Sequence, residues 1–304
     1  MGSGSWTSDT WKSYRTAAKI DTSRSVEDIY NMGDVKPKYL PQNVMRESCD
    51  SEEHPESTPI AVFLDVTGSM GRIVHNCAKR LGDFVGEIYE KSIVTDPQIL
   101  FGAVDDSFAT DTPLQVTQYE SDIRIAEQLT DLKFISRGAG NGFESYPLAW
   151  YFCARHTKID SYEKHGRKGF LFTMGDDGYP NEMSVAEIKK VFGDKIPNRV
   201  TTQEILNEVS QKYEVFHLCF TQGGSYYEKD YRDWKKLMGS HAIKVTDWQY
   251  LPEIMNGVLA IYQGKTLKDI VAEKDEDCKE CLTIALRGLK PTEIVEGSDL
   301  VTFA

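Results

Sequence analysis

Residues 59–65 read PIAVFLD and residues 66–71 read VTGSMG, and this stretch decides the fold. The continuous apolar run at 59–64 is typical of a strand that is buried on both faces of a parallel sheet. A polar loop follows it, and apolar residues then recur at helical spacing from Ile73 to Ile88. We therefore predict a buried strand, a loop that carries function and an amphipathic helix, in that order.

The same unit recurs along the chain. Further apolar runs predict buried strands at 99–104, 168–174, 213–220 and 241–245. The segments between them have helical periodicity, at 121–132, 143–157, 184–192, 201–212, 226–238 and 247–262. This alternation predicts an α/β fold, a doubly wound and mostly parallel sheet flanked by helices, with its sites at the carboxyl ends of the strands.

The 304 residues exceed what this one domain needs. We assign 57–264 to the domain, 1–56 to an N-terminal extension with a short helix at 25–32, and 265–304 to a C-terminal tail. The aromatic residues near Trp6 and Trp11 anchor the extension either to the domain or to a partner.

Composition excludes several classes of protein. Lys and Arg number 35 against 47 Asp and Glu, so the net charge of −12 argues against nucleic-acid binding. No apolar stretch is long enough to cross a membrane, and the opening MGSGSWTSDTWKSYR lacks the apolar part of a secretory signal. Six scattered cysteines are typical of reduced thiols, and we expect a cytoplasmic protein.

The first loop carries the most specific chemistry. Asp65, Thr67 and Ser69 alternate, so one turn can direct a carboxylate and two hydroxyls to a common point. These hard oxygen ligands suit Mg²⁺ or Mn²⁺. The structural alternative is that Asp65 only caps the helix that follows.

Residues 63–70, FLDVTGSM, resemble the first motif of the von Willebrand factor type A domain family. The resemblance extends over 57–264 and implies a Rossmann-like fold with a metal-ion-dependent adhesion site. In that family an Asp and two hydroxyls of the first loop, a Thr of a second loop and an Asp of a third surround the metal. The resemblance implies that Asp65, Thr67, Ser69 and Asp176 hold the ion.

The second loop departs from the family pattern, since 136–145 (SRGAGNGFES) has no Thr before the helix. Glu144 and Ser145 are the candidate ligands there, as in the Gly-rich form with Glu-Ser of some bacterial members. Alternatively, Glu144 is a first-turn acid that favours the helix dipole. In the third loop we favour Asp176 over its neighbour Asp177, because Asp176 lies nearer the strand end.

Other acids and motifs give weaker signals. Asp105 and Asp106 follow the second strand, and we expect solvated turn acids there, with a peripheral metal role as the lesser alternative. Cys278 and Cys281 form a single C-x-x-C without a nearby His, which favours two thiols on a charged helix over a zinc site. His217 lies within an apolar strand, where we expect a core residue.

The function that the resemblance implies is metal-dependent protein binding and not catalysis. The ion would keep one open position for an Asp or Glu of a protein partner, and bacterial members often act as adaptors beside AAA-type ATPases or in other multi-protein systems. The alternative is a Mg²⁺-dependent phosphatase or phosphodiesterase with Asp65 as nucleophile or metal ligand. A metal-free structural module is the third possibility.

Overall fold

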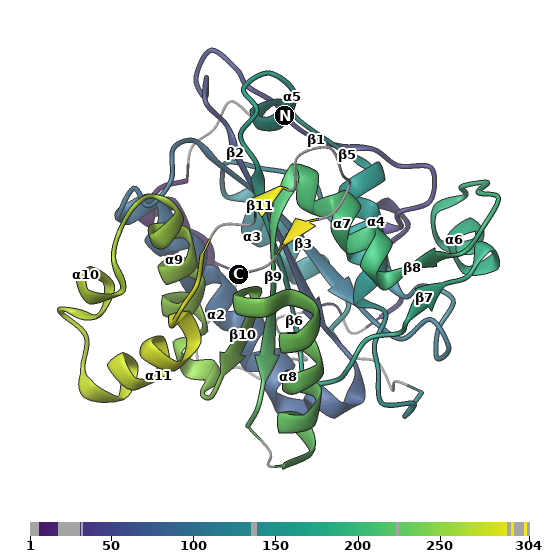
Figure 1. Cartoon of the computed structure of the whole chain (residues 1–304). Helices are drawn as coiled ribbons and strands as arrows, with labels where there is room; N and C mark the ends of the chain where they lie inside the picture. Colours follow the sequence, from purple (N-terminus) through teal and green to yellow (C-terminus); the bar gives the residue numbers. More distant parts are fainter. Residues whose placement is uncertain are drawn as a thin grey trace.

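The computed structural model describes residues 6–17, 31, 33–134, 139–222, 225–290, 293–294 and 301–302. Its centre is a sheet surrounded by helices (Figure 1). The sheet has six strands in the order β10-β9-β6-β2-β3-β4, in which only β4 runs antiparallel to its neighbour. The strands are β2 (Thr58–Asp65), β3 (Pro97–Val104), β4 (Leu114–Val116), β6 (Gly169–Gly175), β9 (Tyr213–Phe220) and β10 (Ala242–Val245). The four long strands lie within two residues of their predicted bounds.

The apolar run of β2 is buried on both faces, as predicted. Ile60, Val62 and Leu64 belong to one apolar cluster. Ala61 and Phe63 belong to the other, because successive side chains of a strand point to opposite faces. The sheet therefore lies between two apolar layers.

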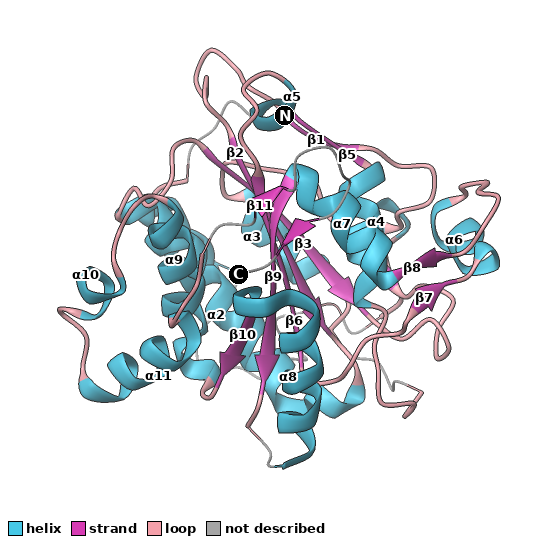
Figure 2. Ribbon diagram, in the orientation of Figure 1, coloured by secondary structure: helices cyan, strands magenta, loops and turns pink. Residues whose placement is uncertain are grey.

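Helices cover both faces of the sheet (Figure 2). The first layer holds α2 (Gly71–Glu90), α3 (Arg124–Asp131), α9 (Leu251–Tyr262) and α11 (Glu276–Leu286). The second holds α4 (Tyr146–Arg155), α6 (Val185–Phe192), α7 (Thr202–Lys212) and α8 (Ser225–Met238). The chain is thus an α/β protein with a mostly parallel central sheet flanked by helices, as the alternation of strands and helices predicted.

Several short elements were not predicted. They are the edge strand β4 of the central sheet, the helices α1 (Ser8–Ala17), α5 (Asp160–Glu163) and α10 (Leu267–Val271), the strand pair β1 (Arg46–Ser48) and β5 (Thr157–Ile159), the pair β7 (Glu182–Met183) and β8 (Val200–Thr201), and the pair β11 (Glu293–Ile294) and β12 (Val301–Thr302). Turns of 3₁₀ helix lie at Pro37–Tyr39, Gly68–Met70, Gly239–His241 and Trp248–Tyr250. The helix predicted at 25–32 falls outside the described residues except for Asn31.

The N-terminal segment packs against the domain. Trp6 is 4% exposed and its ring lies 5.2 Å from that of Trp11 and 6.0 Å from that of Tyr89 on α2. Trp11 covers Gly82 of α2 so closely that a Cβ there would lie 2.5 Å from the indole. These contacts resolve the alternative left open by the sequence for Trp6 and Trp11, whose anchor is the domain.

The tail also adds to the same core, because Cys278, Leu282 and Leu286 of α11 are buried in the cluster that contains α9. All six cysteines lie in described segments and are free thiols, as predicted. Among the described residues, no helix has both the length and the apolar character that crossing a membrane requires.

The order of the strands places the candidate site. In the sheet, β3 follows β2 along the chain and lies on one side of it. The later strands β6 and β9 lie on the opposite side of β2. The loops after β2 and β6 therefore diverge where the strand order reverses. Ligands of doubly wound sheets bind in the crevice that such a reversal creates.

Candidate functional site

A continuous chain of hydrogen-bonded oxygens joins the loops after β2 and β6. Thr67 Oγ1 donates to Asp65 Oδ1 at 2.6 Å and lies 3.2 Å from Ser69 Oγ. Ser69 Oγ in turn donates to Asp176 Oδ1 at 3.0 Å. The structure thus brings together four of the residues that the sequence nominated, from two loops more than 100 residues apart.

The first loop is shaped by its own side chains. The backbone N–H of Thr67 also donates to Asp65 Oδ1, at 2.8 Å, so the carboxylate fixes the turn two residues beyond it. A 3₁₀ turn at Gly68–Met70 then leads into α2, whose first turn receives no side-chain cap. The alternative that Asp65 caps this helix is therefore wrong, because its Oδ1 accepts from Thr67.

Tyr146 supports the other side of Asp65, and the sequence did not point to it. Its hydroxyl donates to Asp65 Oδ2 at 2.7 Å, and both residues are 0% exposed. Gly175, at the end of β6, leaves the space for this contact, since a Cβ there would lie 2.6 Å from Asp65 Oδ2 and 2.7 Å from Tyr146 Cζ. Burial raises the pKa of Tyr146 well above its ordinary value, so the hydroxyl keeps its proton and acts as a donor.

Aromatic side chains pack against the ring of Tyr146. The ring of His217 stacks on Trp234 at 3.6 Å and meets Tyr146 edge-on at 4.7 Å. Trp234 Nε1 donates to the carbonyl oxygen of Asp177 at 3.0 Å, which ties the third loop to α8. His217 is fully buried, so its prediction as a core residue is confirmed.

The second loop brings Glu144 and Ser145 to the same edge. Glu144 is 3% exposed, and its Oε2 is buried without a hydrogen-bond partner. The helix begins only at Tyr146, so Glu144 is not the first-turn acid that the alternative required. Ser145 Oγ accepts from the backbone N–H of Ser107 at 3.0 Å, which connects this loop to the one after β3.

The expectation that Asp105 and Asp106 are solvated was wrong. Asp105 is 9% exposed and Asp106 is 0% exposed. Asp106 Oδ1 accepts from Phe108 N at 2.8 Å, and its Oδ2 accepts from Ala139 N at 3.2 Å. Asp106 is buried because it holds two loops together, a role that depends on a residue 33 positions away.

Buried acids accumulate at this edge of the sheet. The set consists of Asp65, Asp105, Asp106, Glu144, Asp176, Asp177 and Asp230, each at most 9% exposed. Asp230 comes from α8, carries no sequence signal, and has one buried carboxylate oxygen without a hydrogen-bond partner. Within the described part of the chain, no ion pair involves Asp65, Glu144 or Asp176.

Burial and mutual repulsion raise the pKa values of these acids. Burial and then the charge of Asp176 raise the pKa of Asp65, against the hydrogen bonds from Thr67 and Tyr146 that lower it. Burial and then Asp65 raise the pKa of Glu144. Burial, followed by the charge of Asp177, raises the pKa of Asp176 to about 6.

The donor set fits a hard divalent cation. Cis oxygens around Mg²⁺ are separated by about 3.0 Å, the edge of an octahedron with bonds of about 2.1 Å. The separations of 3.2 Å between Thr67 and Ser69 and 3.0 Å between Ser69 and Asp176 are close to this edge. A hydroxyl can donate its proton to a carboxylate while its lone pair faces a metal, so the hydrogen bonds described do not compete with ligation.

The hydroxyls are essential to that fit. In the segments described, no group of three or more His, Cys, Asp and Glu side chains is arranged to hold a metal ion. At this edge Thr67 and Ser69 lie between the carboxylates of Asp65 and Asp176. The arrangement is thus hydroxyl-rich, and its carboxylates alone do not form a site.

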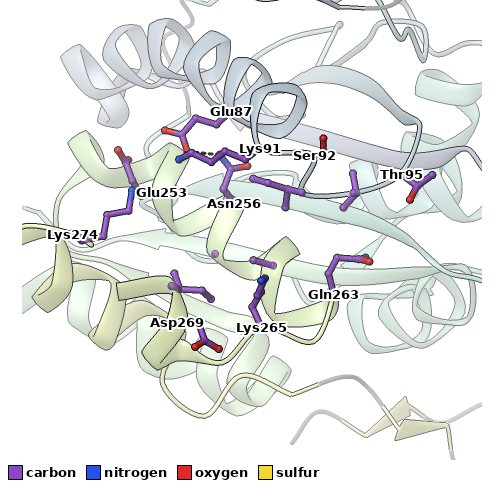
Figure 3. A pocket seen from close by; sticks show the side chains of 15 residues that line it. Glu87, Lys91, Ser92, Thr95, Glu253, Asn256, Gln263, Lys265, Asp269 and Lys274 are labelled. Atoms are coloured by element: carbon purple, nitrogen blue, oxygen red, sulfur yellow. Dashed lines mark hydrogen bonds and ion pairs between the residues drawn. The ribbon is translucent and has the colours of Figure 1, made fainter. Parts of the chain in front are cut away.

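Two other features lie outside this edge. Cys278 and Cys281 are buried on α11, where Thr246 donates to Cys281 Sγ at 3.4 Å. A cavity of about 450 Å³ lies between the end of α2, α9 and α10 (Figure 3). It lies about 30 Å from the acidic edge, because the 20 residues of α2 separate them. Its lining balances three lysines against three acids, so it offers no net charge to an ion.

Comparisons with known proteins assign no family. No family model matches the chain, and no curated protein matches it. Among solved structures it is similar to the pilus adhesin SpaC from Lactobacillus rhamnosus GG in its open conformation, with 10% identity and a TM-score of 0.46, over 77% of this chain and 31% of the adhesin. It is also similar to proximal thread matrix protein 1 from the mussel byssus, with 10% identity and a TM-score of 0.41, over 67% of this chain and 46% of that protein. Similarity at this level gives the chain neither a family nor a function.

Proposed function

We propose that this chain is a protein-binding domain of the von Willebrand factor type A kind, which uses Mg²⁺ or Mn²⁺ at the edge formed by Asp65, Thr67, Ser69 and Asp176. The observation that carries the proposal is the oxygen chain that joins these four side chains at the reversal of the strand order. Glu144, with a buried oxygen that lacks a partner, is the next candidate ligand. Ser145 Oγ accepts from the N–H of Ser107, whereas Asp177 accepts from Trp234 through its backbone carbonyl and so remains a candidate through its carboxylate.

The bound cation would supply a positive charge with an open position for an outside carboxylate. The chain itself holds the hydroxyl oxygens in place through Asp65 and excludes water beneath them with Tyr146. An Asp or Glu of a partner protein is the ligand that this chemistry selects. As part of the proposal, the protein acts in the cytoplasm as an adaptor or scaffold, beside an AAA-type ATPase or in another multi-protein system.

A hydrolytic role receives less support. In that role Asp65 would attack phosphorus or ligate the metal directly. Yet the Asp65 side chain is 0% exposed and accepts three hydrogen bonds that hold the first loop, so it is not presented to the phosphorus of a substrate. A phosphatase screen with Mg²⁺ should give no turnover, and turnover abolished in Asp65→Asn would contradict the binding role.

Thermal unfolding in EDTA and in Mg²⁺ or Mn²⁺ tests the proposed site. A ligand that binds only the folded state stabilises it by about 1.4 kcal/mol at ten times its Kd, which for a domain of this size raises Tm by about 3 to 6 °C. The matched control is Asp194→Ala, because Asp194 also accepts from a buried tyrosine, Tyr151, at 2.8 Å but lies outside the acidic edge. We expect Asp65→Ala to abolish the shift and Asp194→Ala to retain it. No shift in the wild type, or an equal shift in both variants, would refute the site.

A further inference from the structure

Phe108 is the most exposed large apolar side chain of the described residues. It is 76% exposed, compared with 53% for Met45 and 42% for Ile284. It follows β3 in the loop that also contains the buried Asp106. A ring of this size exposed to water is unfavourable, so its exposure at the rim of the candidate site calls for a physical reason.

Hydrogen bonds hold this loop in one conformation, so the exposure of the Phe108 side chain does not result from an unconstrained backbone. Asp106 Oδ1 accepts from the N–H of Phe108, and the carbonyl oxygen of Asp106 accepts from Ala109 N at 2.9 Å and Thr110 N at 3.1 Å. The N–H of Ser107 donates to Ser145 Oγ of the second loop. These bonds fix the Phe108 backbone on both sides and direct its side chain away from the core.

A second aromatic ring joins the first at the acidic edge. Phe143 is partly exposed, and its ring meets that of Phe108 edge-on at a centroid distance of 6.0 Å. It directly precedes Glu144, whose N–H donates to the carbonyl oxygen of Gly178 in the third loop at 3.1 Å. We call Phe108 and Phe143 the rim pair. It borders the oxygen cluster on the side of the second loop.

We infer that the rim pair binds a large apolar side chain of the same polypeptide segment that supplies a carboxylate to the metal. This inference rests on the proposed function and identifies the kind of partner. The buried acids favour a cation, the cation favours a carboxylate, and the adjacent rings favour an apolar group, which a small carboxylate ligand lacks. Because Phe143 and Glu144 are consecutive, the apolar residue should lie one or two positions from the Asp or Glu, the reach of about 3.5 to 7 Å along an extended segment.

A random dodecapeptide library displayed on phage, selected on the full chain in millimolar Mg²⁺ and eluted with EDTA, supplies the probe. We expect the selected peptides to pair an Asp or Glu with a Leu, Ile, Phe or Trp one or two residues away. A synthetic copy of the strongest peptide is then titrated by fluorescence polarisation. We expect Phe108→Ser to weaken its binding about tenfold, and Met45→Ser, which removes a comparably exposed side chain beside β1, to leave binding unchanged.

A double-mutant cycle tests the contact itself. Replacing the apolar residue of the peptide by Ser should weaken binding by the wild type about tenfold but should weaken binding by Phe108→Ser no further. Acidic peptides without an apolar preference, or unchanged affinity of Phe108→Ser, would overturn the inference and leave the metal-dependent function standing. Peptides that bind equally in EDTA or to Asp65→Ala would instead contradict the proposed function, and a selection without any EDTA-eluted peptide counts against both. A dimer of the wild type that Phe108→Ser dissociates would show that the rim pair binds a second copy, which also overturns the inference.

Discussion

Removal of one hydroxyl, in Tyr146→Phe, tests how Asp65 is held. Asp65 accepts three hydrogen bonds, of which two, from Thr67, reach Oδ1 and only one, from Tyr146 at 2.7 Å, reaches Oδ2. Because Asp65 is 0% exposed, no water replaces the lost donor. A hydrogen bond to a buried charged group contributes about 1.5 to 3 kcal/mol. We expect the free energy of unfolding in EDTA to fall by about 2 kcal/mol and Tm to fall by about 4 to 8 °C.

The response to metal gives a second readout. Hydrogen-bond partners that orient a metal site typically account for about 10- to 100-fold in metal affinity. At a Mg²⁺ concentration ten times the wild-type Kd, a tenfold weaker site reduces the stabilisation from about 1.4 to about 0.4 kcal/mol. The assay is thermal unfolding followed by circular dichroism over a series of Mg²⁺ concentrations, with and without EDTA.

Tyr151→Phe is the matched control on the same helix. Tyr151 is also fully buried, and its hydroxyl donates to Asp194 Oδ2 at 2.8 Å, away from the acidic edge. We expect this variant to lose stability in EDTA and to keep the full Mg²⁺ shift. If Tyr146→Phe melts as the wild type does in EDTA, or keeps the wild-type Mg²⁺ shift, the Tyr146 hydroxyl does not hold Asp65 in place for the metal.

Three further outcomes are expected. Gly82→Ala should expose α1 to limited proteolysis, because the new Cβ would lie 2.5 Å from Trp11. Gly86→Ala, whose Cβ would lie 4.0 Å from that ring, should instead stabilise the chain by up to about 1 kcal/mol through helix propensity. Equal rates of proteolysis in the two variants would refute this prediction. Burial lowers the pKa of His217 well below 6.5, so the unfolded chain binds a proton that the folded chain does not, and stability is lost as the pH falls below 6.5. Between pH 7.5 and 5.5 the wild type should lose about 1.4 kcal/mol relative to His217→Phe in urea titrations, and parallel pH profiles would contradict this. Glu144→Gln should reduce the Mg²⁺-induced rise in Tm, and an unchanged rise would remove Glu144 from the ligand set.

Local pattern was sufficient to predict the framework of this fold. The continuous apolar run of β2 results from burial on both faces, and the same cause produces the runs of β3, β6 and β9. Strand ends in such a sheet meet at one edge, so the loops with Asp65 and Asp176 could be placed together before their distance was known. These predictions depend on periodicity within a segment and on the general topology of doubly wound sheets.

The remaining features depend on contacts between distant segments. Tyr146 lies 81 residues from Asp65, and Asp106 accepts from a backbone N–H 33 residues away, so neither role is visible in local sequence. The α1 helix is polar overall, and its docking depends on the fit of Trp11 to Gly82. The strands β1 and β5 have three residues each, too few to show an alternation.

The buried acids of the edge divide into two groups by what their oxygens do. Asp106 uses both carboxylate oxygens to hold the loop that carries Phe108 and the second loop, so its burial is compensated within the protein. Glu144 and Asp230 each retain a buried oxygen with no partner, and burying such a group costs about 1 to 3 kcal/mol. Burial raises the pKa values of both acids, so protonation relieves part of this cost, and a cation would relieve it in the ionised form, since it interacts with several oxygens at once. Stability and metal affinity should therefore be coupled at this edge. A substitution that removes an unpartnered acid should stabilise the metal-free chain and weaken its response to Mg²⁺. A substitution of Asp106 should instead destabilise the chain with and without Mg²⁺, because it releases the loops that carry the rim pair and Glu144.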